Sequence, residues 1–224
     1  MTGKKIILTE DGSNTIYSDK FQSTYHSTHG AIQESKHVFI KHGLDYYYNK
    51  NNKQKISILE YGFGTGLNAF LSLKHSISKK ININYLGLEA YPISLDEYKK
   101  LNYLQALKSS ELQDIFELMH SKEQYINKKL HKHFTFSKEK IKFENFSSDT
   151  RFDIIYFDAF SPDIQNHLWE RPFLDKTVSF LKQNGVFITY GAKGTFKRAL
   201  KSLGLKIENP PGPPGKREIT RGVR

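Results

Sequence analysis

Residues 57–68 read Ser-Ile-Leu-Glu-Tyr-Gly-Phe-Gly-Thr-Gly-Leu-Asn. The start of this stretch is apolar and partly β-branched, which favours a strand buried in a sheet. Three glycines follow at every second position, Gly62, Gly64 and Gly66, and glycine both adopts backbone angles that a Cβ forbids and lets a ligand approach the main chain. Apolar residues then recur at helical spacing from Leu67. The stretch therefore predicts a strand, a glycine turn and a helix N-terminus, which are typical of a nucleotide-binding corner.

The residue before this turn indicates the kind of ligand. The glycine spacing differs from the dinucleotide fingerprint G-x-G-x-x-G, and Glu60 stands just before the turn. A carboxylate there repels a pyrophosphate and attracts a cationic group such as an ammonium or a sulfonium. S-adenosylmethionine carries both groups, so the motif favours S-adenosylmethionine over NAD. A dinucleotide site and a purely structural turn remain alternatives on this motif alone.

Composition narrows the class of protein. A chain of 224 residues with 38% hydrophobic residues predicts one domain, with room for a small appendage. The absence of cysteine excludes disulfides, thiolate chemistry and Cys-type zinc sites. His26 and His29 have no acidic residue at ligand spacing, so we expect no metal. No apolar run has the length of a signal peptide or a membrane span, so we expect a soluble, cytoplasmic protein with no membrane partner.

The charge of the chain predicts a polyanionic partner. The formal net charge is +11, and residues 193–224 hold nine Lys or Arg against Glu208 and Glu218. A basic segment of this kind is typical of nucleic-acid binding. A generally lysine-rich composition is the alternative explanation.

Hydrophobic periodicity predicts an α/β fold of the Rossmann-like type. We expect a mostly parallel central sheet with an antiparallel C-terminal strand and a small N-terminal β extension. Strands are expected at residues 83–88, 134–146, 154–157, 186–190, 205–208 and 216–221, after a hairpin over residues 8–18. Helices are expected at residues 31–44, 94–107, 111–130, 167–181 and 195–203, with a polar connection at 49–54 and a charged tip at 138–140.

Two acidic residues follow buried strands. Glu89 ends the second strand, where an acid can accept hydrogen bonds from both ribose hydroxyls. Asp158 follows the apolar strand over residues 154–157, at the carboxyl end where open α/β sheets bind ligands. The alternatives are a surface acid for Glu89 and an acid that caps the next loop for Asp158.

Four stretches together resemble a known family. They are residues 10–13 with 25–27 and Glu34, residues 60–68, residues 157–162 followed by 168–169, and residues 210–218. The chain resembles the methyltransferases that complete 5-methylaminomethyl-2-thiouridine at the wobble position of tRNA. The similarity covers nearly the whole chain and is to the stand-alone form without the FAD oxidase half, so it implies no FAD.

The resemblance implies a class I methyltransferase that uses S-adenosyl-L-methionine. Residues 1–50 would form an N-terminal extension of hairpin plus helix packed on the core, and residues 51–224 the methyltransferase domain with a basic, RNA-facing C-terminal region. The enzyme would methylate the aminomethyl nitrogen of 5-aminomethyl-2-thiouridine in the anticodon stem-loop, after another enzyme has installed the aminomethyl group. We expect a monomer.

The resemblance also implies roles for individual residues. Asp158 would be the catalytic base. Cofactor-binding roles fall on Tyr25, Glu34, Glu60, Gly62, Phe63, Gly64, Thr65, Gly66, Asn68, Glu89, Asn145 and Asp158. Substrate-binding roles fall on Phe160, Trp169, Lys193, Lys197, Arg198, Lys216 and Arg217, with Phe160 and Trp169 as candidates for stacking on the wobble base. The family often has Gly-Asp where this chain has residues 143–146, so Asn145 is the candidate for the adenine contact.

Three other functions stay open at this point. A methyltransferase or aminopropyltransferase of a small amine would need an acidic substrate pocket and no basic tail. A non-catalytic RNA-binding domain of the same fold would not bind S-adenosylmethionine. An NAD-dependent oxidoreductase is disfavoured by Glu60 and by the glycine spacing.

Overall fold

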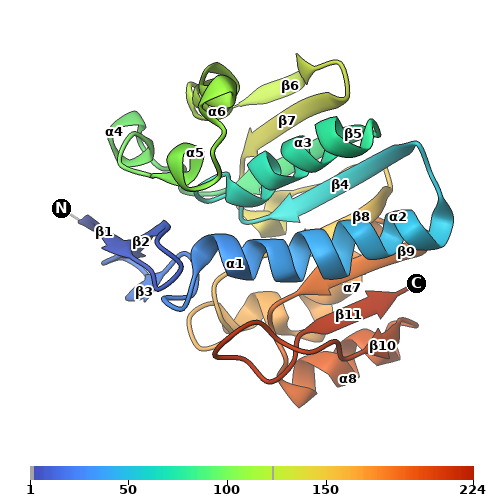
Figure 1. Ribbon diagram of the computed structural model, residues 1–224. Helices are drawn as coiled ribbons and strands as arrows, with labels where there is room; N and C mark the ends of the chain where they lie inside the picture. The colour runs from blue at the N-terminus through green and yellow to red at the C-terminus, as the bar shows by residue number, and fades with distance from the viewer. Residues whose placement is uncertain (1–2, 123) are drawn as a thin grey trace.

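β4 (Lys55–Tyr61) lies at the centre of a large sheet (Figure 1). The structure, a computed structural model, describes residues 3–122 and 124–224, and within these ranges the sheet has eight strands in the order β10-β11-β9-β8-β4-β5-β7-β6. The other strands are β5 (Asn82–Glu89), β6 (Tyr125–His131), β7 (Phe134–Lys140), β8 (Phe152–Phe157), β9 (Leu181–Thr189), β10 (Lys206–Glu208) and β11 (Thr220–Val223).

The inner strands of the sheet are parallel. β4 pairs in parallel with β5 and β8, β5 with β7, and β8 with β9. β11 runs antiparallel to β9 and to β10, and β6 runs antiparallel to β7 at the other edge. The predicted mostly parallel sheet with an antiparallel C-terminal strand is therefore confirmed.

Helices cover both faces of the sheet, as parallel strands require. One face carries α3 (Leu67–Lys79) and a continuous helix made of α1 (Ala31–Ser35), a π-helical segment η1 (Lys36–Asp45) and α2 (Tyr46–Asn51) (Figure 1). The other face carries α7 (Arg171–Ser179) and α8 (Gly194–Ser202). Ile58 belongs to the hydrophobic cluster on one face of the sheet, and its neighbour Leu59 belongs to the cluster on the other face. Burial on both faces explains why β4 is a continuous apolar run in the sequence.

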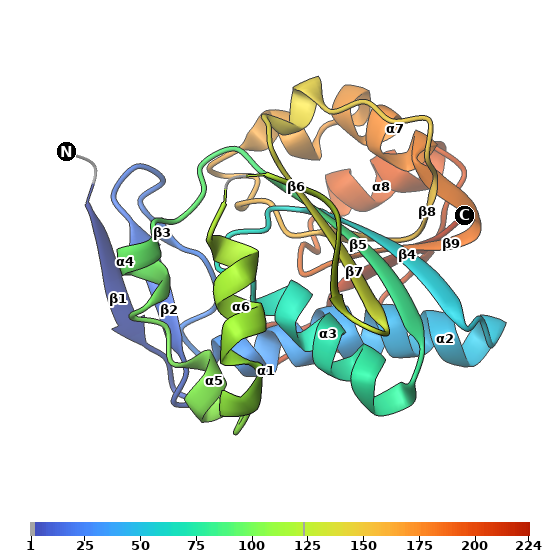
Figure 2. The ribbon, with the colours of Figure 1, turned by 90° about the horizontal axis from the view of Figure 1, so that it is seen from above.

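A small three-stranded antiparallel sheet precedes the helix. It consists of β1 (Lys4–Leu8), β2 (Asn14–Ser18) and β3 (Ser23–Thr24). Figures 1 and 2 place it beside the end of the large sheet to which β4 points. The Lys4 ammonium lies 3.2 Å from the Glu97 carboxylate, and the backbone N–H of Asn14 donates to Asn102 Oδ1 at 2.7 Å. The predicted hairpin is confirmed, and these contacts fix it to the segment after β5.

The segment between β5 and β7 differs from the prediction. The Ser94 capping box is present, but α4 (Leu95–Tyr98) is short and α5 (Tyr103–Ala106) follows as a separate helix. The predicted helix over residues 111–130 is wrong in its second half. A 3₁₀ turn, η2 (Ser110–Leu112), leads into α6 (Gln113–His120), and the chain then forms β6 on the edge of β7 because strand pairing outweighs local helical preference there.

Two smaller predictions are also wrong. Lys138 is not at a charged tip but inside β7, where it is 2% exposed and donates to the Met119 carbonyl at 2.7 Å. The turn lies instead between β6 and β7. The polar connection at 49–54 begins later than predicted, because α2 continues to Asn51 and Tyr47 is buried against the sheet. No helix in the described ranges is both long and apolar enough to cross a bilayer.

Candidate active site

The register of the central strands brings three segments to one edge of the sheet. Tyr61 lies opposite Leu88 of β5 and opposite Phe157 of β8. Glu89 follows Leu88 and Asp158 follows Phe157, so both residues lie at the same edge of the sheet, next to the glycine turn. The chain turns sharply after Tyr61 because Gly62 has φ +94°, and a Cβ there would collide with the backbone oxygen of Asp158.

The rest of the glycine turn is as the sequence predicts. Gly64 has φ +50° and Gly66 has φ +73°, both in the left-handed region. Gly66 immediately precedes Leu67, the first residue of α3. The strand, glycine turn and helix N-terminus are therefore confirmed.

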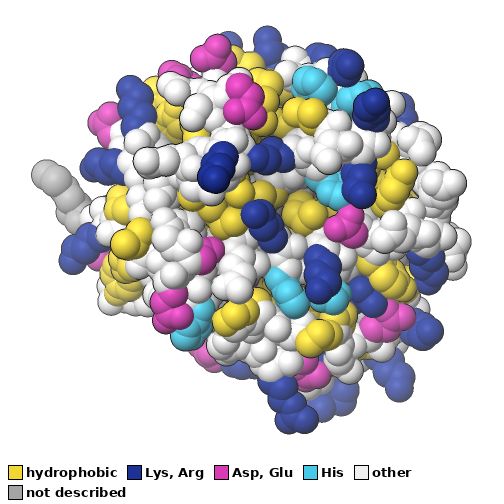
Figure 3. Space-filling view, in the orientation of Figure 1, with side chains coloured by type: hydrophobic (Ala, Val, Ile, Leu, Met, Phe, Trp, Pro, Cys, Tyr) yellow, Lys and Arg dark blue, Asp and Glu magenta, His cyan; other side chains and the backbone are white. Residues whose placement is uncertain are grey.

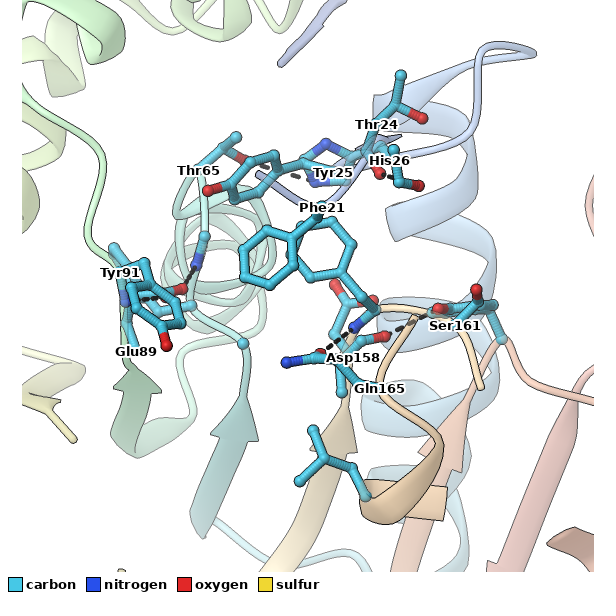
Figure 4. Close-up of a pocket in the computed structure, with 18 of the residues that line it drawn as sticks. Phe21, Thr24, Tyr25, His26, Thr65, Glu89, Tyr91, Asp158, Ser161 and Gln165 are labelled. Carbon is cyan, nitrogen blue, oxygen red and sulfur yellow. Dashed lines mark hydrogen bonds between the residues drawn. The ribbon is translucent and has the colours of Figure 1, made fainter. Parts of the chain in front are cut away.

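A cavity of about 530 Å³ opens at this edge (Figure 4). In Figure 4, Glu89 and Asp158 lie on opposite sides of the cavity, and Phe21 lies between them in projection. The predicted site residues that line the cavity are Tyr25, Glu34, Gly62, Phe63, Gly64, Thr65, Asn68, Glu89, Asp158, Phe160 and Lys216.

The Glu89 carboxylate is held by two backbone N–H groups. The Gly64 amide donates to Oε2 at 2.7 Å and the Tyr91 amide donates to Oε1 at 2.7 Å. Burial raises the pKa of Glu89, and the two hydrogen bonds work against that rise. Each oxygen keeps lone-pair capacity toward the cavity, which suits a pair of neighbouring hydroxyl donors.

Asp158 is fixed by a side-chain amide. Asn68 Nδ2 donates to Asp158 Oδ2 at 2.8 Å and also to Glu60 Oε1 at 2.9 Å. Burial, followed by the nearby charge of Glu34, raises the pKa of Asp158 to about 7. A carboxyl group that titrates near neutrality can accept or return a proton at the working pH of a cell.

Glu60 does not reach the cavity. The side chain is 0% exposed, and burial followed by the charge of Asp158 raises the pKa of Glu60 to about 8. The expectation that Glu60 faces a cationic ligand is therefore wrong. Its observed contact is with Asn68, so it supports the amide that holds Asp158.

An ion pair joins the helix that follows the N-terminal sheet to the loop before β11, beside Asp158. The Lys216 ammonium lies 2.6 Å from Glu34 Oε1, and the Ser27 amide donates to Glu34 Oε2 at 2.8 Å. The Lys216 nitrogen also lies 3.9 Å from the centre of the Tyr190 ring. The Tyr190 hydroxyl donates to the Ala159 carbonyl at 2.8 Å, which connects this cluster to the loop after β8.

The candidate for the adenine contact, Asn145, does not line the cavity. Asn145 ends the 3₁₀ turn η3 (Phe143–Asn145) and is not among the residues that line the cavity, whereas Glu144 is. Glu144 Oε1 lies 2.7 Å from His167 Nε2, and His167 also lines the cavity. The sequence pointed to this segment after β7, but the direction of each side chain depends on the turn.

Trp169 is a core residue. It is 4% exposed and packs against Phe157 and Phe196, with ring centres 5.0 and 4.9 Å apart. Its indole N–H donates to the Phe160 carbonyl at 2.8 Å. The expected stacking of Trp169 on a base is therefore wrong. Trp169 is the last residue of the 3₁₀ turn η4 (Asn166–Trp169), and its ring supports the Phe160 loop from the core side.

The remaining predicted residues lie outside the cavity lining. Lys193 pairs with Asp163 at 2.6 Å, and Lys197 pairs with Glu218 at 2.7 Å. The others are Gly66, Arg198 and Arg217, of which the two arginines are exposed. Lys and Arg side chains are spread over the whole face in Figure 3 and are not confined to the C-terminal segment.

The missed residues of the site include Phe21, Tyr91, Glu144 and His167. Tyr91 comes shortly after a predicted strand, so its position was a usable signal, whereas Glu144 lies inside the range predicted as a strand, residues 134–146, and so carried no such signal. Phe21 lies in the turn between β2 and β3, and no local pattern in the sequence connects that turn with the sheet edge.

Known proteins resemble this chain over nearly its whole length. A "tRNA 5-methylaminomethyl-2-thiouridine biosynthesis bifunctional protein MnmC" from Leptospira borgpetersenii is 29% identical over 221 residues, which are 93% of this chain and 33% of that protein. A protein of the same name from Campylobacter jejuni is 26% identical over 212 residues, 89% of this chain and 33% of that protein. The chain thus spans about a third of the length of these relatives.

Solved structures share the fold. The crystal structure of MNMC2 from Aquifex aeolicus superposes with a TM-score of 0.78 at 23% identity, covering 99% of this chain and 70% of that chain. A class I S-adenosylmethionine-dependent methyltransferase from Listeria monocytogenes, described as putative in its own name, gives a TM-score of 0.50 at 14% identity, covering 87% of this chain and 61% of that chain. The predicted Rossmann-like methyltransferase fold is confirmed.

A family model described as "S-adenosyl-L-methionine-dependent methyltransferase" matches residues 104–224, which is more than half of the chain. This match covers β7, β8 and the loops that supply Asp158 and Lys216. The resemblance inferred from the sequence motifs is confirmed. The chain belongs to this family of S-adenosyl-L-methionine-dependent methyltransferases.

Proposed function

We propose that this methyltransferase methylates the aminomethyl nitrogen of 5-aminomethyl-2-thiouridine at the wobble position of tRNA. The names of the relatives contain the product nucleoside, 5-methylaminomethyl-2-thiouridine. The observation that carries the proposal is the position of Asp158 in the cavity beside the glycine turn, held by Asn68. The amine that receives the methyl group must first lose a proton, so a group that accepts this proton is needed here.

The cavity fits the methyl donor. Glu89 presents two oriented carboxylate oxygens to the cavity, as a ribose requires. Gly64 lies so close to Tyr25 that a Cβ would come within 2.9 Å of the ring, so only glycine allows Tyr25 to pack beside the turn in the cavity lining. We assign the adenine contact to Glu144, which reaches the cavity where Asn145 does not.

Asp158 acts on the acceptor. A primary alkyl amine is mostly an ammonium ion at neutral pH and has no lone pair to donate. The ionised Asp158 carboxylate accepts that proton, directly or through water, while Asn68 keeps the carboxylate in place. The donor supplies an activated methyl group, whose bond to sulfur breaks as the bond to nitrogen forms and leaves a neutral thioether. The aromatic side chains around the cavity exclude water from the reacting atoms.

Basic residues around the cavity supply the electrostatic attraction for tRNA. Lys216 lines the cavity, and the exposed Arg198 and Arg217 belong to the C-terminal region of residues 193–224. Contacts of this kind bind phosphates and weaken as salt increases. In this proposal, residues 1–50 form the extension, residues 51–224 form the catalytic domain, and the enzyme works on cytoplasmic tRNA after a separate reaction has installed the aminomethyl group.

The test compares Asp158→Asn with the wild type on tRNA from cells that lack this methyl group. The protein is incubated with labelled S-adenosyl-L-methionine, and the nucleosides are then separated. We expect label in 5-methylaminomethyl-2-thiouridine, and for Asp158→Asn a kcat lower by roughly 10²- to 10⁴-fold because the proton acceptor is lost. Affinity for S-adenosyl-L-homocysteine should change little.

Asp163→Asn is the matched control. Asp163 lies in the same loop, but its carboxylate is 76% exposed and pairs with Lys193 outside the cavity. Normal turnover of a folded Asp158→Asn protein would contradict the catalytic role. Label in a different nucleoside, or none in tRNA, would contradict the proposed substrate.

A further inference from the structure

The N-terminal extension places an aromatic ring inside the cavity. Phe21 lies between β2 and β3 and stacks on Phe160, with ring centres 4.3 Å apart and an angle of 27° between the planes. Phe160 stands two residues after Asp158, the proposed base. Two tyrosines contact this pair edge-on: the ring centre of Tyr91 lies 5.7 Å from that of Phe21, and the ring centre of Tyr25 lies 5.3 Å from that of Phe160. Three segments far apart in the sequence thus build one aromatic cluster at the reaction site (Figure 4).

The stacked pair is accessible from the cavity. Both Phe21 and Phe160 line the cavity and are only half-buried, unlike the core aromatics. Phe21 is carried by a turn and not by the large sheet, so it can separate from Phe160 without moving a core strand. Two flat apolar faces that part in this way match the two faces of an unstacked nucleobase.

A basic groove continues from the aromatic cluster. This groove has a volume of about 380 Å³ and shares Phe21, Tyr25, Ala90 and Tyr91 with the cavity. Among the described residues that line it, Lys4, Lys20 and Lys140 are basic and Glu97 is acidic. The Lys20 ammonium lies 3.0 Å from the centre of the Tyr91 ring, directly beside the aromatic cluster.

We propose that the N-terminal extension forms half of the acceptor-nucleotide site: the target base inserts between Phe21 and Phe160, and a neighbouring phosphate of the RNA binds in the basic groove at Lys20. This inference rests on the proposed function, since it names how the RNA substrate is held. A small free amine would gain nothing from this groove, because its cation would be repelled by the lysines. A nucleotide within an RNA strand supplies both a flat base and an adjacent anion.

The extension also offers matched controls. Leu8 on β1 is 69% exposed and apolar, and it lies outside both the cavity and the groove. Lys5 is exposed on the same strand, and its side chain points to the opposite face from Lys4. Leu8→Ala and Lys5→Glu therefore make the same kinds of change as Phe21→Ala and Lys20→Glu without touching the proposed site.

The experiment measures binding, separately from turnover. Affinity for an anticodon stem-loop RNA is determined by fluorescence anisotropy at several salt concentrations, and affinity for S-adenosyl-L-homocysteine by calorimetry, on the full chain. We expect Phe21→Ala to weaken RNA binding by roughly 5- to 150-fold, the range for loss of one base-stacking contact. Phe21→Tyr should retain most of the affinity. Lys20→Glu should weaken binding and reduce the salt slope by about one.

Each outcome decides between the two proposals. Unchanged affinity for S-adenosyl-L-homocysteine, with RNA binding weakened in both variants and normal in both controls, supports the inference. RNA affinities of Phe21→Ala and Lys20→Glu equal to those of the controls would overturn it, as would losses confined to S-adenosyl-L-homocysteine. A wild type that binds the RNA through Phe21 and Lys20 but does not methylate tRNA would overturn the proposed function and leave the binding site standing.

Discussion

At the scale of single residues, the charges around Asp158 set the pKa of this proposed base. Burial and the charge of Glu34 raise the pKa of Asp158, while the hydrogen bond from Asn68 and the charge of Lys216 lower it. The resulting pKa of about 7 makes the ionised fraction of Asp158 sensitive to pH in the physiological range. Glu34 and Lys216 form an ion pair with each other, so a change in either one alters the field at Asp158.

The pH profile of kcat/KM should report this balance. The proposed mechanism needs the ionised carboxylate, so kcat/KM should fall as pH decreases through about 7, the pKa of Asp158. Glu34→Gln removes a negative charge and should move this limb to lower pH. Lys216→Met removes a positive charge and should move it to higher pH.

Glu10→Gln is the control, because this carboxylate is 69% exposed, pairs with His29 and does not line the cavity. Its pH profile should match that of the wild type. Profiles of Glu34→Gln and Lys216→Met that also coincide with the wild type would show that another group limits the reaction.

Residues directly after buried strands were predictable, and residues placed by turns were not. Glu89 and Asp158 follow apolar strands, and the parallel register then brings them to one edge. Whether Glu60 faces the ligand depends on the direction of its side chain near the end of β4. In the structure this side chain points into the protein. Phe21 reaches the cavity through the packing of a separate sheet, which leaves no periodic signal in the sequence.

At the scale of elements, β4, β8 and β9 are tied together at the edge opposite the cavity. Asp153 of β8 is 2% exposed and accepts hydrogen bonds from the Tyr47 hydroxyl at 2.6 Å and from the Ser57 amide at 2.9 Å. The ammonium group of Lys182 lies 2.8 Å from the same carboxylate. Burial alone would raise the pKa of Asp153, but these hydrogen bonds outweigh it and lower the pKa below its usual range.

Asp153→Asn should therefore destabilise the protein at neutral pH. The loss should be about 2–4 kcal/mol, because charge-assisted hydrogen bonds to a buried carboxylate are replaced by weaker ones. The lowered pKa means that the wild-type contribution is present above about pH 4 and is lost as pH falls further. Urea unfolding at several pH values measures this.

The acid limb of the stability curve is the decisive part of that measurement. The difference between wild type and Asp153→Asn should be full at pH 7 and shrink steadily below about pH 4. A difference that stays constant down to strongly acidic pH would mean that the ionised carboxylate does not stabilise the contact between β4 and β8.

Elements of the core were predictable and elements at the periphery were not. The strands β4, β5 and β8 lie where apolar runs predict them, since burial on both faces leaves a continuous signal. The strand predicted over residues 186–190 is the second half of β9, which begins earlier, at Leu181, where the end of a helix was predicted. β6 lies at the sheet edge with most of its residues exposed, so its sequence carries little apolar pattern. Pairing with β7 determines its conformation.

At the scale of the whole molecule, the N-terminal extension and the loop before β11 meet at the cavity. The N-terminal sheet contributes Phe21 and Tyr25, and the C-terminal loop contributes Lys216, which pairs with Glu34. The large sheet supplies the glycine turn and Asp158 from its carboxyl edge. The reaction site thus depends on docking of the extension onto the sheet, and no single segment contains it.

A crystal structure of the full chain with S-adenosyl-L-homocysteine tests this arrangement most directly. We expect the ribose hydroxyls within hydrogen-bonding distance of the Glu89 carboxylate, the amino-acid part of the ligand beside the glycine turn, and the sulfur facing Asp158 across the cavity. A ligand bound elsewhere on the protein, or an Asp158 carboxyl group turned away from the sulfur, would contradict the account.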